Sequence, residues 1–213
     1  MFLNQIHVIL IWAIPTLFAI TMRETAHGLV AKWYKDHTAW QCGRVTLNPV
    51  PHIDLFGTII FPVLCLLTGG LLFGWAKPVP IVARNLTPRK YAMVFVAFAG
   101  SLANVIMAIF WGMLILHHPS FGSNQAWFEL AQAGVIINLS LATINLLPIP
   151  PLDGGKVLAE FIPYSKRNIL DFLEQYGIFI LVLLMFTGIL QIILTPVFLG
   201  LAWIVKVVVG IGA

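Results

Sequence analysis

Four ionisable side chains lie within apolar parts of the sequence, where charge is costly and therefore marks candidate functional positions. Arg23, Glu24 and His27 lie near the end of the first apolar run, and Asp153 lies in the segment NLLPIPPLDGG. Residues 23 and 27 are four apart and residues 24 and 27 are three apart, so a helix would project all three side chains from one face. The prolines before Asp153 interrupt a helix, which lets a polar side chain turn back into a bundle. Glu24, His27 and Asp153 could relay protons, as in a small transporter, or Arg23 could neutralise a carboxylate as a buried ion pair.

The composition requires a membrane environment for the elements that position these side chains. The chain has 213 residues, of which 60% are hydrophobic and only 9% are charged. In lipid the backbone must satisfy its own hydrogen bonds, and apolar runs of about 20 residues do so as helices. We therefore expect an all-α, multi-pass integral membrane protein whose first apolar run is a retained helix. A net charge of +4 from residues beside apolar runs fits membrane orientation and excludes nucleic acid as a partner.

Hydropathy predicts about five or six hydrophobic helices. The expected segments are His7 to about Trp33, Leu55–Phe73, Tyr91–Leu116, Ala126–Leu147, and an apolar stretch from Ile178 to the C-terminus. We expect Pro196 to divide that last stretch into a spanning helix, about Ile178–Leu194, and a second hydrophobic helix.

Two segments after the first helix are expected to be irregular. Pro62 and the pair Gly69-Gly70 favour a re-entrant hairpin over a full span for Leu55–Phe73. Between His37 and His52, alternating apolar and polar residues predict one or two short strands. We expect a single membrane-embedded domain, residues 1–213, with a motif-bearing core at about 20–158 and C-terminal helices at about 176–213.

Four motifs in this order resemble those of the compact bacterial site-2 proteases. RETAHG at 23–28 resembles HExxHG, GRVTLNPVPHIDLFGT with FGWAKPVPI resembles the segment that follows it, AGSLAN at 99–104 resembles AGPxAN, and NLLPIPPLDGG resembles the motif of the third metal ligand. The similarity covers about Ile20 to Leu158. It implies an intramembrane protease that cuts a substrate's transmembrane segment in the lipid bilayer, and it implies a location in the bacterial inner membrane.

The resemblance also implies roles for particular residues. It places the zinc ligands at positions 23, 27 and 153, the general base at Glu24, and a residue that holds substrate or stabilises the oxyanion at Asn145. A catalytic zinc takes three protein ligands and activates a water in the fourth position. His27 and Asp153 can serve as two of these ligands.

Arg23 departs from the family pattern because a guanidinium has no lone pair to bind zinc. At an effective dielectric of about 20, a dication and a guanidinium about 4 Å apart repel each other by roughly 8 kcal/mol. Either the zinc is held differently or it is absent. His52 and Cys65 are weak alternative ligands, whereas His7 is too far along the helix to reach the site.

Three functions remain open from the sequence. The leading hypothesis is a site-2 type intramembrane zinc metalloprotease with an altered metal site. The main alternative is an inactive pseudoprotease that binds transmembrane segments without cutting them, and the third is the proton-coupled transporter. The sequence indicates neither the substrate nor the oligomeric state.

Overall fold

The computed structural model describes residues 2–60, 77–88, 91–118, 124–163, 165 and 167–210. The helices in these ranges are α1 (Phe2–Trp33), α2 (Thr38–Gln41), α4 (Ala92–His117), α6 (Gln125–Asn145), α7 (Asp153–Phe161), α8 (Arg167–Phe186) and α9 (Ile189–Val209). Short helical turns η1 (Val50–His52), η2 (Leu55–Ile60) and η3 (Ala83–Asn85) lie in the connections. The prediction of an all-α fold is confirmed.

Five of the described helices are long and apolar enough to cross a membrane, namely Ile9–Trp33 of α1, α4, α6, Asn168–Phe186 of α8, and α9. The protein is therefore a multi-pass integral membrane protein, as the composition predicted. Large apolar side chains cover its outside, including Phe95 and Phe110 of α4, and Phe179 and Phe186 of α8. These side chains are suited to contact lipid, because the bilayer core contains no water that would make their exposure unfavourable.

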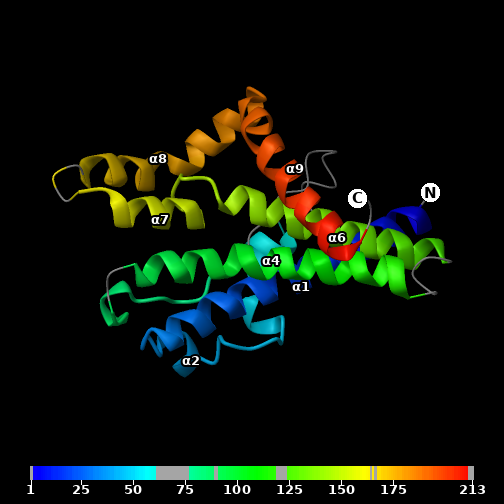
Figure 1. The fold of residues 1–213 in the computed structure, drawn as a ribbon, viewed down its shortest axis with the longest axis horizontal. Helices are drawn as coiled ribbons and strands as arrows, with labels where there is room; N and C mark the ends of the chain where they lie inside the picture. Colours follow the sequence, from blue (N-terminus) through cyan, green and yellow to red (C-terminus); the bar gives the residue numbers. More distant parts are fainter. Residues whose placement is uncertain are drawn as a thin grey trace.

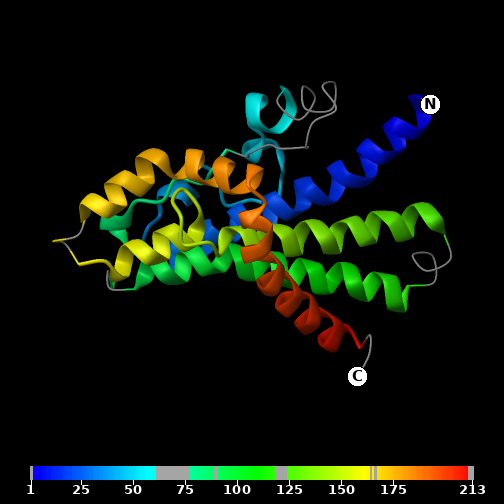
Figure 2. The same cartoon turned by 90° about the horizontal axis from the view of Figure 1, so that it is seen from above.

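The centre of the fold is a bundle of α1, α4 and α6 that lie side by side (Figures 1 and 2). Alanines fill much of the interface, among them Ala19 and Ala31 of α1, Ala97 and Ala108 of α4, and Ala142 of α6. Helices in lipid gain little from hydrophobic burial, so small residues stabilise them by allowing close backbone approach. α9 packs across α4 and α6, where Val205 and Val209 contact Ala108 and Leu139.

Local sequence explains where α6 and α7 begin and end. The side chain of Asn124 caps α6 by accepting hydrogen bonds from the backbone N–H groups of Ala126 and Trp127. The helix ends at Asn145, before the Pro148–Pro151 segment that cannot continue it. α7 then starts at Asp153. This interruption brings the N-terminus of α7 back against α4.

The prediction of one or two short strands between His37 and His52 needs correction. Residues 38–52 contain α2, turns and η1, and no strand. Among the described residues this alternating pattern has no neighbouring strand with which to pair, since Thr38–Gln41 is helical and only the N–H of Lys77 bonds the His52 carbonyl. The re-entrant hairpin falls mostly on residues 61–76, which lie outside the described residues.

The C-terminal break also lies elsewhere than predicted. α8 ends at Phe186 and α9 starts at Ile189, so the chain turns at Gly188, whose φ of +74° suits glycine. Pro196 lies inside α9. A proline removes one backbone hydrogen bond, but helices that cross membranes tolerate it where the surroundings compensate.

Candidate functional site

The structure brings Arg23, Glu24, His27, Asn145 and Asp153 together at one place, and we refer to these five residues as the Arg23 cluster. α1 supplies the first three, α6 ends on Asn145, and α7 begins with Asp153. Glu24, His27, Asn145 and Asp153 are all buried. The helical spacing of residues 23, 24 and 27 therefore places their side chains as the sequence predicted.

The guanidinium of Arg23 is the centre of the cluster. Its Nη2 donates to Asp153 Oδ2 at 2.7 Å and to Asn145 Oδ1 at 2.9 Å, and its Nη1 donates to Glu24 Oε1 at 2.8 Å. One cation thus joins α1 to residues that follow it by 122 and 130 positions. Charge-assisted hydrogen bonds of this kind are stronger than neutral ones, so they hold the three helices in register.

Glu24 has partners on both carboxylate oxygens. Oε1 accepts from Arg23, and Oε2 accepts from the backbone N–H of Val79 at 2.8 Å. Val79 belongs to the KPVPI segment that follows the undescribed residues 61–76. This segment fixes the carboxylate, which cannot reorient toward a water without breaking one of the two bonds.

His27 is oriented by the backbone of α4. Its Nδ1 lies 2.7 Å from the carbonyl oxygen of Val96, which can only accept, so Nδ1 is the donor. In a neutral imidazole Nε2 then carries the lone pair. Nε2 lies 3.2 Å from Asp153 Oδ2 and has no hydrogen-bond partner. Gly100 leaves room for this ring, because a Cβ at position 100 would lie 2.3 Å from Nε2.

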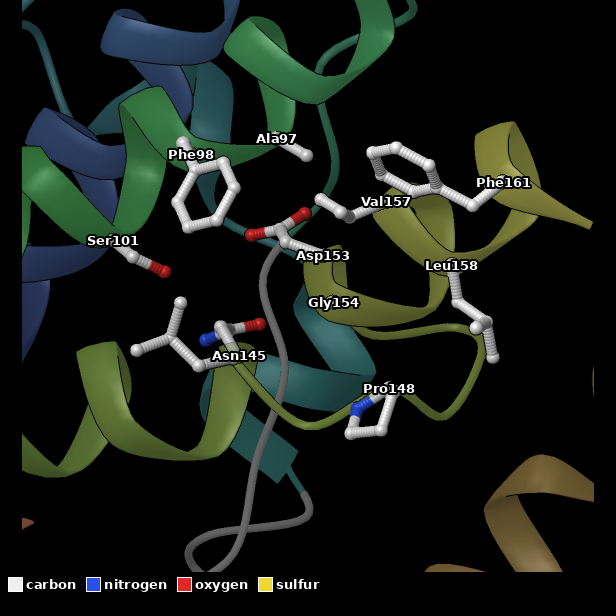
Figure 3. A pocket seen from close by; sticks show the side chains of 11 residues that line it. Ala97, Phe98, Ser101, Asn145, Pro148, Asp153, Gly154, Val157, Leu158 and Phe161 are labelled. Carbon is white, nitrogen blue, oxygen red and sulfur yellow. The ribbon is translucent and has the colours of Figure 1, made fainter. Parts of the chain in front are cut away.

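Asp153 is surrounded by positive charge. Oδ2 contacts Arg23 and His27, and Oδ1 accepts from Lys156 Nζ at 2.8 Å. Figure 3 shows Asp153 and Asn145 at the edge of a cavity beside α4 and α7.

The predicted alternative ligands do not join the cluster. The ring of His52 is buried, and its Nε2 lies 3.1 Å from the carbonyl oxygen of Thr46. Cys65 lies outside the described residues. Within the described parts of the chain, no three His, Cys, Asp or Glu side chains are placed to hold a metal.

Sequence reasoning missed three contributors to the site. Lys156 follows Asp153 by three residues, a spacing at which helical side chains meet, so the sequence did contain a signal for that ion pair. The Val79 N–H and the Val96 carbonyl are backbone groups, and no residue type marks them. Only the folded chain identifies them.

The residues present do not fit a catalytic zinc in this arrangement. His27 Nε2 and Asp153 Oδ2 are oriented like two ligands of one metal, but a zinc bound to that oxygen would lie about 2 Å from it. The Arg23 Nη2 atom already lies 2.7 Å from the same oxygen. The guanidinium of Arg23, which is positively charged and has no lone pair, therefore occupies the space beside Asp153 Oδ2 that a zinc would take.

Comparisons with known proteins identify the family. Residues 112–188 match the profile of Peptidase family M50. The chain is 35% identical to the Bacillus subtilis protein named "Putative zinc metalloprotease YwhC" over 86% of this chain and 83% of that protein. The chain belongs to peptidase family M50. The resemblance to site-2 proteases is thus confirmed, and the family together with the name of this relative supports a metalloprotease.

Other M50 relatives carry similar names. "Putative zinc metalloprotease Rip2" of Mycolicibacterium smegmatis is 28% identical over 80% of this chain and 64% of that protein. "Putative zinc metalloprotease MJ0611" of Methanocaldococcus jannaschii is 43% identical over 34% of this chain and 36% of that protein. No solved structure matches the chain significantly. Zinc is therefore associated with the family through the names of these relatives.

Proposed function

We propose that this M50 protein binds the transmembrane segment of another membrane protein at the Arg23 cluster and does not hydrolyse it, because the guanidinium replaces the catalytic zinc. The observation that carries the proposal is the set of three bonds from Arg23 to Glu24, Asn145 and Asp153. The family supplies the substrate class, and the charge of Arg23 changes what the site does with it.

Together with Lys156, the Arg23 cluster is electrically balanced without a metal. Arg23 and Lys156 contribute two positive charges, and Glu24 and Asp153 contribute two negative charges. Buried charges are tolerated when they are paired and hydrogen-bonded. A zinc ion would add two positive charges to this set and would lie beside a guanidinium that cannot lose its proton.

The other residues of the cluster are also committed to structural bonds. Both oxygens of Glu24 accept hydrogen bonds, one from Arg23 and one from the Val79 N–H, and these bonds fix the carboxylate in one orientation. Asn145 accepts from Arg23 and donates to the carbonyl of Leu141 at 2.7 Å. These bonds support a rigid binding surface in place of a reactive centre.

An active zinc protease is the second candidate, and one observation favours it. His27 Nε2 is buried, has no hydrogen-bond partner, and lies 3.2 Å from Asp153 Oδ2. Two ligands of one tetrahedral zinc lie about this far apart, since each bond is about 2 Å long. This function requires Arg23 to turn away and another group to complete the metal site.

Zinc content and proteolysis separate the two candidates. The protein is purified in detergent, its zinc is measured, and cleavage of a model transmembrane substrate is followed on gels. We expect the natural chain to hold far less than one zinc per molecule and to leave the substrate intact. In Arg23→His the third ligand is restored, so the zinc content should rise toward one per molecule.

The matched control is the double variant Arg23→His with His27→Ala, which removes a ligand and should lose the zinc again. Stoichiometric zinc together with cleavage by the natural chain would show that the protein is an active protease. Cleavage by Arg23→His alone would show that the remaining machinery is intact and that Arg23 is what silences it.

A further inference from the structure

A cavity of about 260 Å³ lies next to the Arg23 cluster, between α4, the end of α6 and α7. Its walls are mainly apolar and include Phe98 of α4 with Val157, Leu158 and Phe161 of α7. Figure 3 shows these side chains around the space, with Asp153 and Asn145 on one side of it. The cavity is therefore continuous with the site where a transmembrane segment is proposed to bind.

Ser101 is the exception among the polar groups of this cavity. Its residue is only 5% exposed, and its hydroxyl has no hydrogen-bond partner. A helical serine commonly bonds the carbonyl four residues earlier, as Thr143 does with Leu139, but Ser101 does not. Its side chain points from α4 toward the space beside Asp153 and Asn145 (Figure 3).

Asn145 and Asp153 also line the cavity, but both are already engaged. Asn145 bonds Arg23 and Leu141, and the two oxygens of Asp153 accept from Arg23 and Lys156. Of the three polar side chains that line this cavity, all within the described part of the chain, Ser101 alone lacks a partner. Burying a hydroxyl unpaired is costly, so the arrangement is complete only when a ligand supplies an acceptor or donor.

We propose that this cavity receives one large apolar side chain of the bound transmembrane segment, at a point where that segment is unwound, and that Ser101 donates a hydrogen bond to a free backbone carbonyl there. The inference rests on the proposed function and names the feature that the site selects. The apolar walls suit a Leu or Phe side chain, because such a chain can fill the space and make van der Waals contacts with the walls.

The need for an unwound segment follows from backbone chemistry. Inside a helix each carbonyl already accepts from the N–H four residues later, so it offers little to Ser101. A segment interrupted by proline or glycine exposes carbonyls that need donors within the membrane. A buried donor at the edge of an apolar cavity satisfies this need while the neighbouring side chain fills the space.

The test measures binding of synthetic peptides to the full chain in detergent by fluorescence anisotropy. The probe is a labelled Leu/Ala transmembrane peptide of about 20 residues with a central Pro-Gly pair followed by Phe. A second peptide replaces that Phe by Ala, and a third lacks the Pro-Gly pair. We expect the probe to bind at least about tenfold more tightly than the uninterrupted peptide, because only the probe offers free carbonyls.

Two variants test the cavity. Ser101→Ala removes the donor and should weaken probe binding about three- to tenfold. Val157→Phe fills the space and should abolish the preference for Phe over Ala in the peptide. The matched controls are Ser140→Ala, at an exposed serine of α6, and Leu102→Phe, at an exposed position of α4, and neither should change the affinity.

The outcomes distinguish the inference from the function on which it rests. If the natural chain binds none of the peptides, the proposed function fails and the inference fails with it. If the natural chain binds the probe but Ser101→Ala and Val157→Phe bind it with unchanged affinity and preference, the proposed function stands and the cavity inference is overturned.

Discussion

The bundle of α1, α4 and α6 and the C-terminal pair α8 and α9 are both apolar, yet they are buried to different extents. In the apolar, membrane-spanning stretches of α1, α4 and α6, 33%, 39% and 39% of the residues are buried, whereas in those of α8 and α9 the share is 11%. The bundle also holds the Arg23 cluster. Hydropathy alone therefore does not distinguish helices that build a site from helices that mainly face lipid.

The difference lies in what each region packs. The bundle combines alanine contacts with buried polar groups that must find partners, such as Glu24 and His27 of α1. In α8, large side chains such as Phe179 and Phe186 are 71% and 81% exposed. Substitutions of similar chemistry should thus be costly in the bundle and tolerated in the C-terminal pair.

α8 nevertheless touches the segment that leads to the site. A Cβ at Gly177 would lie 1.8 Å from the carbonyl oxygen of Pro150, so only glycine permits this close approach. Pro150 belongs to the interruption between α6 and α7 that positions Asp153. The C-terminal pair therefore contacts the segment that leads to the site, although most of its surface is exposed.

Replacing the central cation should have the largest effect. Arg23→Met leaves the carboxylates of Glu24 and Asp153 without their common partner and should lower the free energy of unfolding by about 3–5 kcal/mol. For a chain of this size, that corresponds to a fall of the denaturation midpoint by roughly 6–20 °C. Thermal denaturation in detergent measures it.

The control for this variant is Lys206→Met, which removes an exposed cation of α9. We expect a change within about 0.5 kcal/mol, as for most surface substitutions. Equal losses in the two variants would contradict the view that the cation holds the bundle together.

Adding a single methyl group at a helical glycine should have the next largest effect. Gly100→Ala would place its Cβ 2.3 Å from His27 Nε2 and 3.0 Å from Arg23 Cγ, so the ring must shift and the helices must separate. Overpacking of this kind costs about 1–3 kcal/mol. The same substitution at Gly200 of α9 meets nothing within 4 Å, and it should stabilise slightly through higher helix propensity.

Denaturation midpoints of these two alanine variants, compared with that of the natural chain, provide the measurement. A loss at Gly100 with no loss at Gly200 would support the contrast between the regions. Tolerance of alanine at both positions would mean that α1 and α4 are not in the close contact described above.

The sequence predicted the bundle well because the membrane restricts the possibilities. The expected segments Tyr91–Leu116 and Ala126–Leu147 correspond to α4 (Ala92–His117) and α6 (Gln125–Asn145) within two residues at each end. A helix is the structure that satisfies its own backbone in lipid, so an apolar run of the right length defines it. The grouping of Arg23, Glu24 and His27 followed from the helical period in the same way.

Other features depend on tertiary contacts that the sequence does not display. Pro196 was expected to end a helix, but the turn occurs at Gly188, where a positive φ is available without strain. The predicted strands between His37 and His52 did not form because pairing needs a neighbour, which local alternation cannot provide. The partners of Glu24 and His27 are backbone groups of Val79 and Val96, which carry no residue signal.

The smallest of the expected losses concerns Asp36, a buried carboxylate just beyond α1. It accepts hydrogen bonds from the N–H groups of Thr38 and Val82 and from the amide of Asn85, and so ties the end of α1 to α2 and η3. The Thr38 hydroxyl donates a further hydrogen bond to this carboxylate. Burial alone would raise the pKa of Asp36, but the hydrogen bonds together lower that pKa below its ordinary value of 3.8. Asp36→Asn replaces one accepting oxygen by a donor and should cost about 1–2 kcal/mol at neutral pH.

The pH dependence of this loss follows from the direction of the pKa shift. Because the pKa of Asp36 is lower in the folded chain than its ordinary value, the stabilisation is fully present above pH 3.8 and disappears as the pH falls through the folded pKa. The stability difference between the natural chain and Asp36→Asn should therefore be constant from neutral pH down to about pH 5 and should shrink below pH 3.8. Asp171→Asn, at an exposed position of α8, provides the matched comparison and should change stability little at either pH. A difference for Asp36→Asn that stays constant down to strongly acidic pH would show that its cost comes from the altered shape of the side chain, not from the lost negative charge.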